Sequence, residues 1–177
     1  MPNVIKSGDS GNTAKVTSDG LLQTYATTRG SFTQVNLDGD AYNINTGFIT
    51  LTNAADTPVL YLKNNETRDF LVTAIAVGVK DSTGGTDLVA ITIVRNPTAG
   101  TIVSNASAVA INSNRNFGSN KVLTADAYKG ATGSTMTDGT DHILVVQPDS
   151  GRLFATVDEV LPKGTSIGIK IAPPANN

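Results

Sequence analysis

Residues 70–94 have the sequence FLVTAIAVGVKDSTGGTDLVAITIV, and this stretch decides the fold class. Apolar side chains occupy both alternating faces of its first ten residues and one face of its last seven. Valine, isoleucine and threonine dominate both ends and Gly78 lies inside the first, which disfavours a helix. Because a loop containing Gly84 and Gly85 separates the two apolar runs, the pattern predicts two long strands joined as a central β-hairpin.

The composition extends this prediction to the whole chain. Its 24 Thr, 16 Val and 12 Ile favour strands, and its 16 Asn and 17 Gly suit turns. Nine or ten strands and at most one short helix are expected, and no repeat of propeller or solenoid length is present. We therefore expect an all-β fold, an antiparallel two-sheet β-sandwich that is jelly-roll-like. Besides the central pair, the segments expected to be strands are 42–51, 59–62, 142–146, 152–157 and 166–171.

Several local patterns give finer expectations. The strand pattern begins at Phe32, and a switch of apolar parity beside Gly47 predicts a bend or bulge there. Residues 101–103 are predicted to form a short strand, whereas residues 106–111 suit either a strand or a brief helical turn. The Asn-rich residues 112–120 predict a tight, ordered loop, and a second loop is expected at residues 129–140.

The first thirty residues differ from the rest. Residues 1–30 are polar and have few neighbouring apolar side chains, which predicts an extended N-terminal arm preceding a β-sandwich domain at residues 31–177. The arm is either a frayed terminus or a segment that becomes ordered against a neighbouring subunit. In the second case Leu21, Leu22 and Tyr25 are its candidate partner-contact residues.

Charge and hydropathy exclude several classes of function. The formal net charge is −2, the Lys and Arg residues are scattered, and only nine Phe and Tyr are present, so nucleic-acid binding is not expected. No apolar run approaches the ~20 residues that span a bilayer, and no secretory signal is visible, so we expect synthesis in the cytoplasm and no membrane partner. The absence of cysteine excludes disulfides and thiolate–zinc sites.

Few residues suit catalysis or metal binding. His142 is the single histidine and is expected to be structural, because no metal-ligand cluster or nucleophile accompanies it in sequence. Asp38 and Asp40 resemble the start of a calcium loop, but the twelfth position is Ile49 instead of the required Glu. Asp138 lies in a turn-like context, and a surface cation between loops stays an alternative. We expect no catalytic residue, no cofactor and no metal, and hence not an enzyme.

Five phrases carry a resemblance to a known family. They are LYLKNN (60–65), NPTAG (96–100), NRNFGS (114–119), YKGATG (128–133) and LPKGTSIG (161–168), followed by Pro173 and Pro174. In this order they resemble virion structural proteins of tailed bacteriophages, in particular head decoration (cement) proteins with a β-sandwich or jelly-roll body. The resemblance extends from about residue 14 to residue 174 and includes no catalytic residue.

The resemblance implies a protein of the virion, on the outer surface of the capsid. It would bind the major capsid protein, commonly as a homotrimer, and lock neighbouring capsomers together. Many modest contacts around a shell act together through avidity. Asn114, Arg115 and Phe117 in the Asn-rich loop are candidate partner-contact residues beside those of the arm. A tail or head-fibre module that binds a host receptor or glycan is the alternative, and a glycan depolymerase is a third, which the scarcity of Glu and His disfavours.

Overall fold

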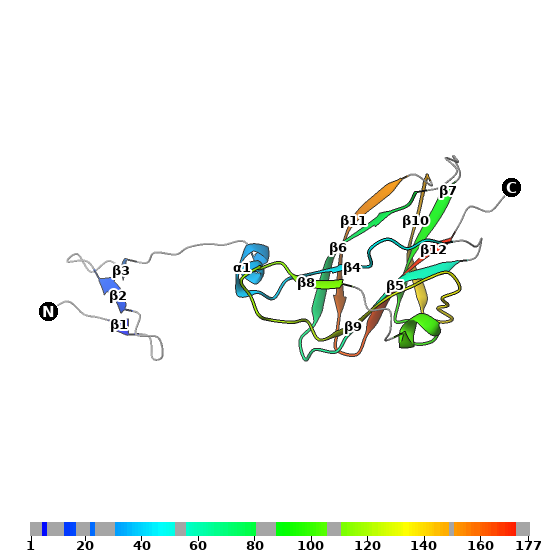
Figure 1. Ribbon diagram of the computed structural model, residues 1–177. Helices are drawn as coiled ribbons and strands as arrows, with labels where there is room; N and C mark the ends of the chain where they lie inside the picture. Colours follow the sequence, from blue (N-terminus) through cyan, green and yellow to red (C-terminus); the bar gives the residue numbers. More distant parts are fainter. Residues whose placement is uncertain are drawn as a thin grey trace.

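The computed structural model describes residues 5–6, 13–16, 22–23, 31–51, 56–80, 88–105, 111–148 and 151–172. Within these ranges the protein is mostly antiparallel β-structure in several sheets, with one short α-helix (Figure 1). The expectation of an antiparallel all-β protein is therefore confirmed.

The largest sheet has five strands, and all its neighbouring pairs are antiparallel. Its order is β10 (Thr140–Pro148), β7 (Leu88–Arg95), β12 (Ser166–Ala172), β5 (Thr57–Asn64) and β9 (Ala125–Lys129). Since β10 and β9 form its two edges, this sheet is open.

Two strand pairs pack against this sheet. One joins β11 (Arg152–Leu161) to β6 (Phe70–Gly78), and the other joins β4 (Tyr42–Asn45) to β8 (Ile111–Asn114). A single core cluster connects β6 and β11 to the five-stranded sheet, and Ile44 of β4 packs on it. Its buried members are Val59, Leu62, Ile75, Ile91, Ile93, Ala127, Leu161, Ile167 and Ile169.

The strand pairs are nested along the chain. β5 pairs with β12, β6 pairs with β11, and β7 pairs with β10. The strands β5, β6 and β7 therefore pair with β12, β11 and β10, in the reverse of their order along the chain. The innermost strands of this nest, β8 and β9, do not pair with each other; β8 pairs with β4 and β9 with β5.

The predicted central hairpin is wrong, although both of its strands form. β6 pairs with β11, whereas β7 lies between β10 and β12 in the other sheet. Ile91 and Ile93 of β7 belong to the core cluster, so this strand is central to its sheet. In β6 the even-numbered Phe70 and Val72 face the core, but after Val72 the odd-numbered Ile75 and Val77 face it instead. This switch lies opposite the register shift in β11 near Asp158. The local apolar pattern predicts strands well but does not determine their partners.

Other expectations have mixed outcomes. The strands expected at 59–62, 142–146, 152–157 and 166–171 are confirmed within β5, β10, β11 and β12. Gly47, just after β4, has a φ of +66°, which supports the predicted bend. The strand predicted at residues 101–103 is wrong, because these residues belong to the 3₁₀ helix η1 (Thr101–Ser104). Residues 106–110 lie outside the described ranges.

A short helix replaces the start of the strand pattern predicted from Phe32. Helix α1 (Ser31–Asp38) is closed by Gly39, whose φ of +73° suits the residue after a helix C-terminus. The backbone N–H groups of Gly39 and Asp40 donate to the carbonyls of Asn36 and Val35, at 3.1 and 3.0 Å. Gly39 is thus the signal in the local sequence that marks where this helix ends.

Three short strands are described before α1. They are β1 (Ile5–Lys6), β2 (Thr13–Val16) and β3 (Leu22–Gln23), paired antiparallel in the order β1-β2-β3. Leu22 lies in β3, opposite Val16, whereas Leu21 and Tyr25 lie outside the described residues. The boundary between an arm and a domain at residue 30 stays a prediction.

Candidate protein-contact surfaces

The Asn-rich loop after β8 is held by its own asparagine side chains. Asn114 Nδ2 donates to the carbonyl oxygens of Gly39 (2.8 Å) and Lys121 (3.1 Å), and Asn116 Nδ2 donates to that of Leu37 (2.9 Å). The Asn114 and Asn116 side-chain oxygens accept from backbone N–H groups two residues ahead. These bonds fasten the loop to the end of α1. The ordered loop predicted at residues 112–120 therefore forms at residues 115–120, whereas residues 112–114 belong to strand β8.

This scaffold presents two side chains to solvent. The Arg115 guanidinium lies 4.8 Å from the centre of the Phe32 ring, a cation–π arrangement, and Phe117 is fully exposed. Asn114 supports the loop from within, whereas Arg115 and Phe117 are placed for contact with a partner. Their role as contacts stays a prediction.

Ion pairs brace the same end of the molecule. Asp40 accepts from Lys121 Nζ at 2.8 Å, and an Arg68 nitrogen lies 3.9 Å from its other carboxylate oxygen. Glu66 accepts from the backbone N–H of Thr124 at 2.7 Å, and this bond holds the pKa of Glu66 below its ordinary value. Asp40, in the segment that resembles the start of a calcium loop, is thus paired with cationic side chains of the protein itself.

The outer face of the β6–β11 pair is an exposed apolar surface that the sequence did not reveal. Phe154 is 71% exposed, Leu71 59% and Val160 55%. Leu71 lies opposite Val160, and Phe154 lies opposite Ala76, so apolar side chains follow each other along the pair. An exposed apolar face on a sheet is a candidate for contact with another protein. We call Leu71, Ala76, Phe154 and Val160 the outer β6–β11 face.

A second apolar set lies on the five-stranded sheet, away from the core. Ile143 of β10 packs on the core, and therefore Leu144 and Val146 on the same strand face outward. Both are exposed, as is Leu88 of the neighbouring strand β7. The protein thus has apolar contact area on two sheets that face opposite ways.

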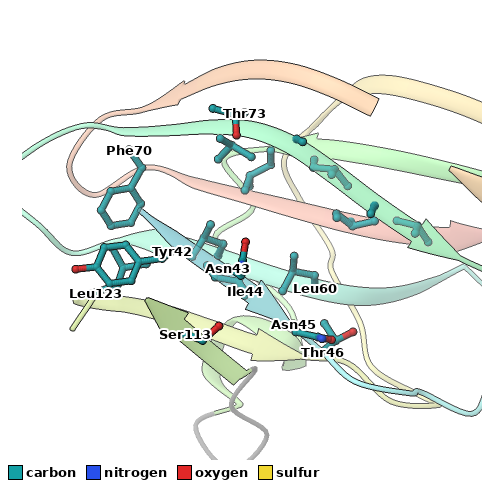
Figure 2. A pocket seen from close by; sticks show the side chains of 18 of the residues that line it. Tyr42, Asn43, Ile44, Asn45, Thr46, Leu60, Phe70, Thr73, Ser113 and Leu123 are labelled. Carbon is teal, nitrogen blue, oxygen red and sulfur yellow. The ribbon is translucent and has the colours of Figure 1, made fainter. Parts of the chain in front are cut away.

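A groove separates β6 from β4 (Figure 2). The open space that includes this groove also reaches Leu71, Ala76 and Phe154; its volume is about 3070 Å³, whereas small-molecule sites usually have roughly 300–1,000 Å³. Its sides are the length of β6 and residues Tyr42–Asn45 of β4, and its floor is apolar. The floor comes from β5 and β12, through Leu60, Leu62, Ile167, Ile169 and Ile171. A space this large and open does not have the dimensions of a small-molecule site.

His142 has a partner that its sequence neighbourhood did not show. His142 Nε2 lies 2.7 Å from Glu159 Oε1, and Arg95 donates to Glu159 Oε2 at 2.8 Å. Register shifts at residues 141–143 and 156–159 accompany this meeting of β10, β7 and β11. The hydrogen bond from Arg95 is the main cause that lowers the pKa of Glu159. The cluster joins two sheets, in keeping with the structural role expected for His142.

Asp138 has a similar bracing role in the loop between β9 and β10. Its carboxylate accepts from the Thr98 hydroxyl and from the backbone N–H groups of Thr98 and Ala99, both at 2.8 Å. The Thr98 hydroxyl contributes most to lowering the pKa of Asp138. This carboxylate therefore closes a loop, as its turn-like sequence context predicted.

Two further kinds of feature are absent from the described residues. No group of three or more His, Cys, Asp or Glu side chains in these ranges is arranged to hold a metal ion. No helix in the same part of the chain has the length and apolar character needed to cross a membrane. Comparisons with protein-family models, curated proteins and solved structures find no match to this chain.

Proposed function

We propose that this chain is a non-enzymatic decoration (cement) protein that binds the outer surface of an assembled phage head and stabilises contacts between neighbouring capsomers. The observation that carries the proposal is the exposed outer β6–β11 face, in a chain whose resemblance is to such proteins. A cement protein needs area for the major capsid protein and for its own copies. The outward side chains of Leu144 and Val146 supply a second surface for a homotrimer.

The nested strand pairs support a jelly-roll-like sandwich as the finer description of the fold. In a jelly roll, a long antiparallel ribbon wraps so that its outermost, second and third strands pair in nested order across two sheets. The pairs β5–β12, β6–β11 and β7–β10 have this order, and they alternate between the two sides of the core. The fourth, innermost pair is replaced by β4–β8 and β5–β9.

The proposal is tested with phage heads that lack the protein. We expect saturable binding at a copy number in the hundreds and a higher temperature of head rupture. The double variant Leu71→Ser, Phe154→Ser should bind about tenfold more weakly or worse, since truncated interface anchors cost more than 1 kcal/mol each. Val122→Ser is the matched control, because Val122 is exposed and lies outside this face. Absence of binding, or unchanged rupture temperature at saturation, would refute the proposal.

A tail or head-fibre module that binds a host receptor or glycan is the second candidate. The exposed Phe117 beside Arg115 favours it, because an aromatic ring and a guanidinium on a rigid loop suit sugar recognition. Binding on a glycan array that is lost in Phe117→Ala, together with a handful of copies per particle, would support this candidate over decoration.

A further inference from the structure

Strands β10 and β11 lie at one side of the core, and each has an edge there without a strand partner among the described residues. β10 is an edge of the five-stranded sheet, and β11 pairs with β6 alone. The contact between His142 Nε2 and Glu159 Oε1, at 2.7 Å, joins the two strands at this side. The side is therefore open in both layers, and we call it the β10–β11 side.

The core is incompletely covered at the β10–β11 side. Ile143 and Val145 of β10 and Leu153 and Val157 of β11 point inward, yet each is only half-buried. In the centre of the same five-stranded sheet, Ile169 of β12 is buried. A second polypeptide along this side would cover the inward side chains of β10 and β11 and extend the core.

β10 lacks the features that protect other free edges from pairing. Short length, charged side chains and bulges are the usual protections. β9 has five residues that include Asp126 and Lys129, β8 has four residues, and β11 has a register shift at Asp158, whose φ is +46°. The free edge of β6 faces β4 across the groove. β10 has nine residues, and no Asp, Glu, Lys or Arg lies between His142 and Pro148. Its open edge is thus a template for another strand.

The sequence of β10 is complementary to itself. Two copies of β10 can pair antiparallel about a two-fold axis at Leu144, the central residue of Thr140–Pro148. Leu144 then lies opposite its own counterpart, and Ile143 lies opposite Val145 of the second copy. Aliphatic side chains therefore meet aliphatic side chains, which stabilises a strand pair. In this register no charged side chain of one β10 lies opposite a charged side chain of the other.

The β10–β11 side has the area that a specific dimer needs. β10 is about 31 Å long at roughly 3.4 Å per residue, and two layers about 10 Å apart, with their outward side chains, make the side about 20 Å wide. Pairing would then bury about 600 Å² on each copy, or about 1,200 Å² in total, the lower limit for a standard interface. We therefore expect association that depends on protein concentration.

We propose that the β10–β11 side joins two copies of this chain, by antiparallel pairing of β10 with β10 about a two-fold axis at Leu144. The five-stranded sheets of the two copies then form one continuous sheet. Leu144 and Val146 stay on the outer face of this sheet, so the apolar surface proposed for a homotrimer remains accessible. The pairing goes beyond capsid decoration and is tested with isolated protein, in the absence of phage heads.

Sedimentation equilibrium tests the association. The full chain should form even-numbered assemblies as its concentration rises, a dimer or, where the trimer also forms, a hexamer. Leu144→Lys should lose the even-numbered species, because like charges would lie opposite each other at the axis. A mixture of Leu144→Lys with Leu144→Glu should restore them. Leu88→Lys is the matched control, because Leu88 is exposed on β7, one strand away from the edge. Assemblies of one or three copies alone would overturn the proposal.

A single cysteine tests the register. Opposite residues of an antiparallel pair have Cα atoms about 4.5–5.5 Å apart, a separation that a disulfide spans. Leu144→Cys should therefore give a covalent dimer on oxidation, and the chain has no native cysteine to interfere. Val146→Cys is the matched control on the same strand and face, because it would lie about 14 Å from its own counterpart.

Two results of the cysteine experiment would refute the pairing. One is equal cross-linking of Leu144→Cys and Val146→Cys, and the other is cross-linking of neither. A parent chain that forms no even-numbered assembly, while Leu144→Lys loses head binding, would assign the β10 edge to the capsid protein instead of a second copy.

Discussion

Substitution of Asn64 gives the sharpest test of how the end of the core is held together. Asn64 is fully buried at the end of β5, and its side chain makes three hydrogen bonds. Its Nδ2 donates to the carbonyls of Arg68 and Leu161, and its Oδ1 accepts from the Glu66 N–H, each at 2.8 Å. One side chain therefore connects β5, the following turn and the end of β11.

Asn64→Ala removes all three bonds and leaves the Leu161 carbonyl without this partner in a buried setting. At a net value of about 1 kcal/mol per bond, the variant should lower the free energy of unfolding by about 3 kcal/mol. That is a large share of the roughly 5–15 kcal/mol typical of a domain. With a urea m-value of about 2 kcal/mol/M, the unfolding midpoint should fall by about 1.5 M at unchanged m.

Two further variants separate the hydrogen bonds from other effects. Asn65→Ala is the matched control, because Asn65 is exposed and is bonded through its backbone N–H; its free energy of unfolding should change by less than about 0.5 kcal/mol. In Asn64→Asp, the introduced carboxylate faces two carbonyl oxygens, so its pKa rises on folding. Relative to the parent, this variant should lose more stability at pH 7 than at pH 4. A loss below about 1 kcal/mol in Asn64→Ala would refute the reasoning.

Three other predictions concern charge and close packing. Glu159→Gln should lower the free energy of unfolding by about 1–2 kcal/mol in urea titration, because the amide carries no negative charge and has one acceptor oxygen in place of the two that bind Arg95 and His142. Folding lowers the pKa values of Glu159 and Asp138, so both carboxylates stabilise the protein above their ordinary pKa values of about 4. This stabilisation is lost as the pH falls through the lowered pKa values, and urea unfolding between about pH 7 and pH 2 should record the loss. Gly130→Ala should prevent folding or lower Tm sharply, because the added Cβ would lie 1.7 Å from the Pro58 carbonyl oxygen. In Gly78→Ala the added Cβ meets no atom within 4 Å, so this control should change Tm little, and equal melting curves for the two variants would contradict this packing.

The existence of the strands was predictable because it depends on local side-chain patterns. Ile167, Ile169 and Ile171 alternate with smaller or polar residues, and this alternation sufficed to locate β12. The partners of a strand depend on residues far away in sequence. The glycine-containing loop between β6 and β7 permits a hairpin, but nothing in it reveals that β6 is in the other layer.

The candidate contact residues were predictable only in part. The asparagines of residues 112–120 indicated an ordered loop, yet the bonds to Gly39 and Leu37 join positions more than seventy residues apart. The outer β6–β11 face was missed because two apolar faces were interpreted as two buried faces. A strand that displays one of them to a partner has the same pattern, and the sequence of one chain does not distinguish these cases.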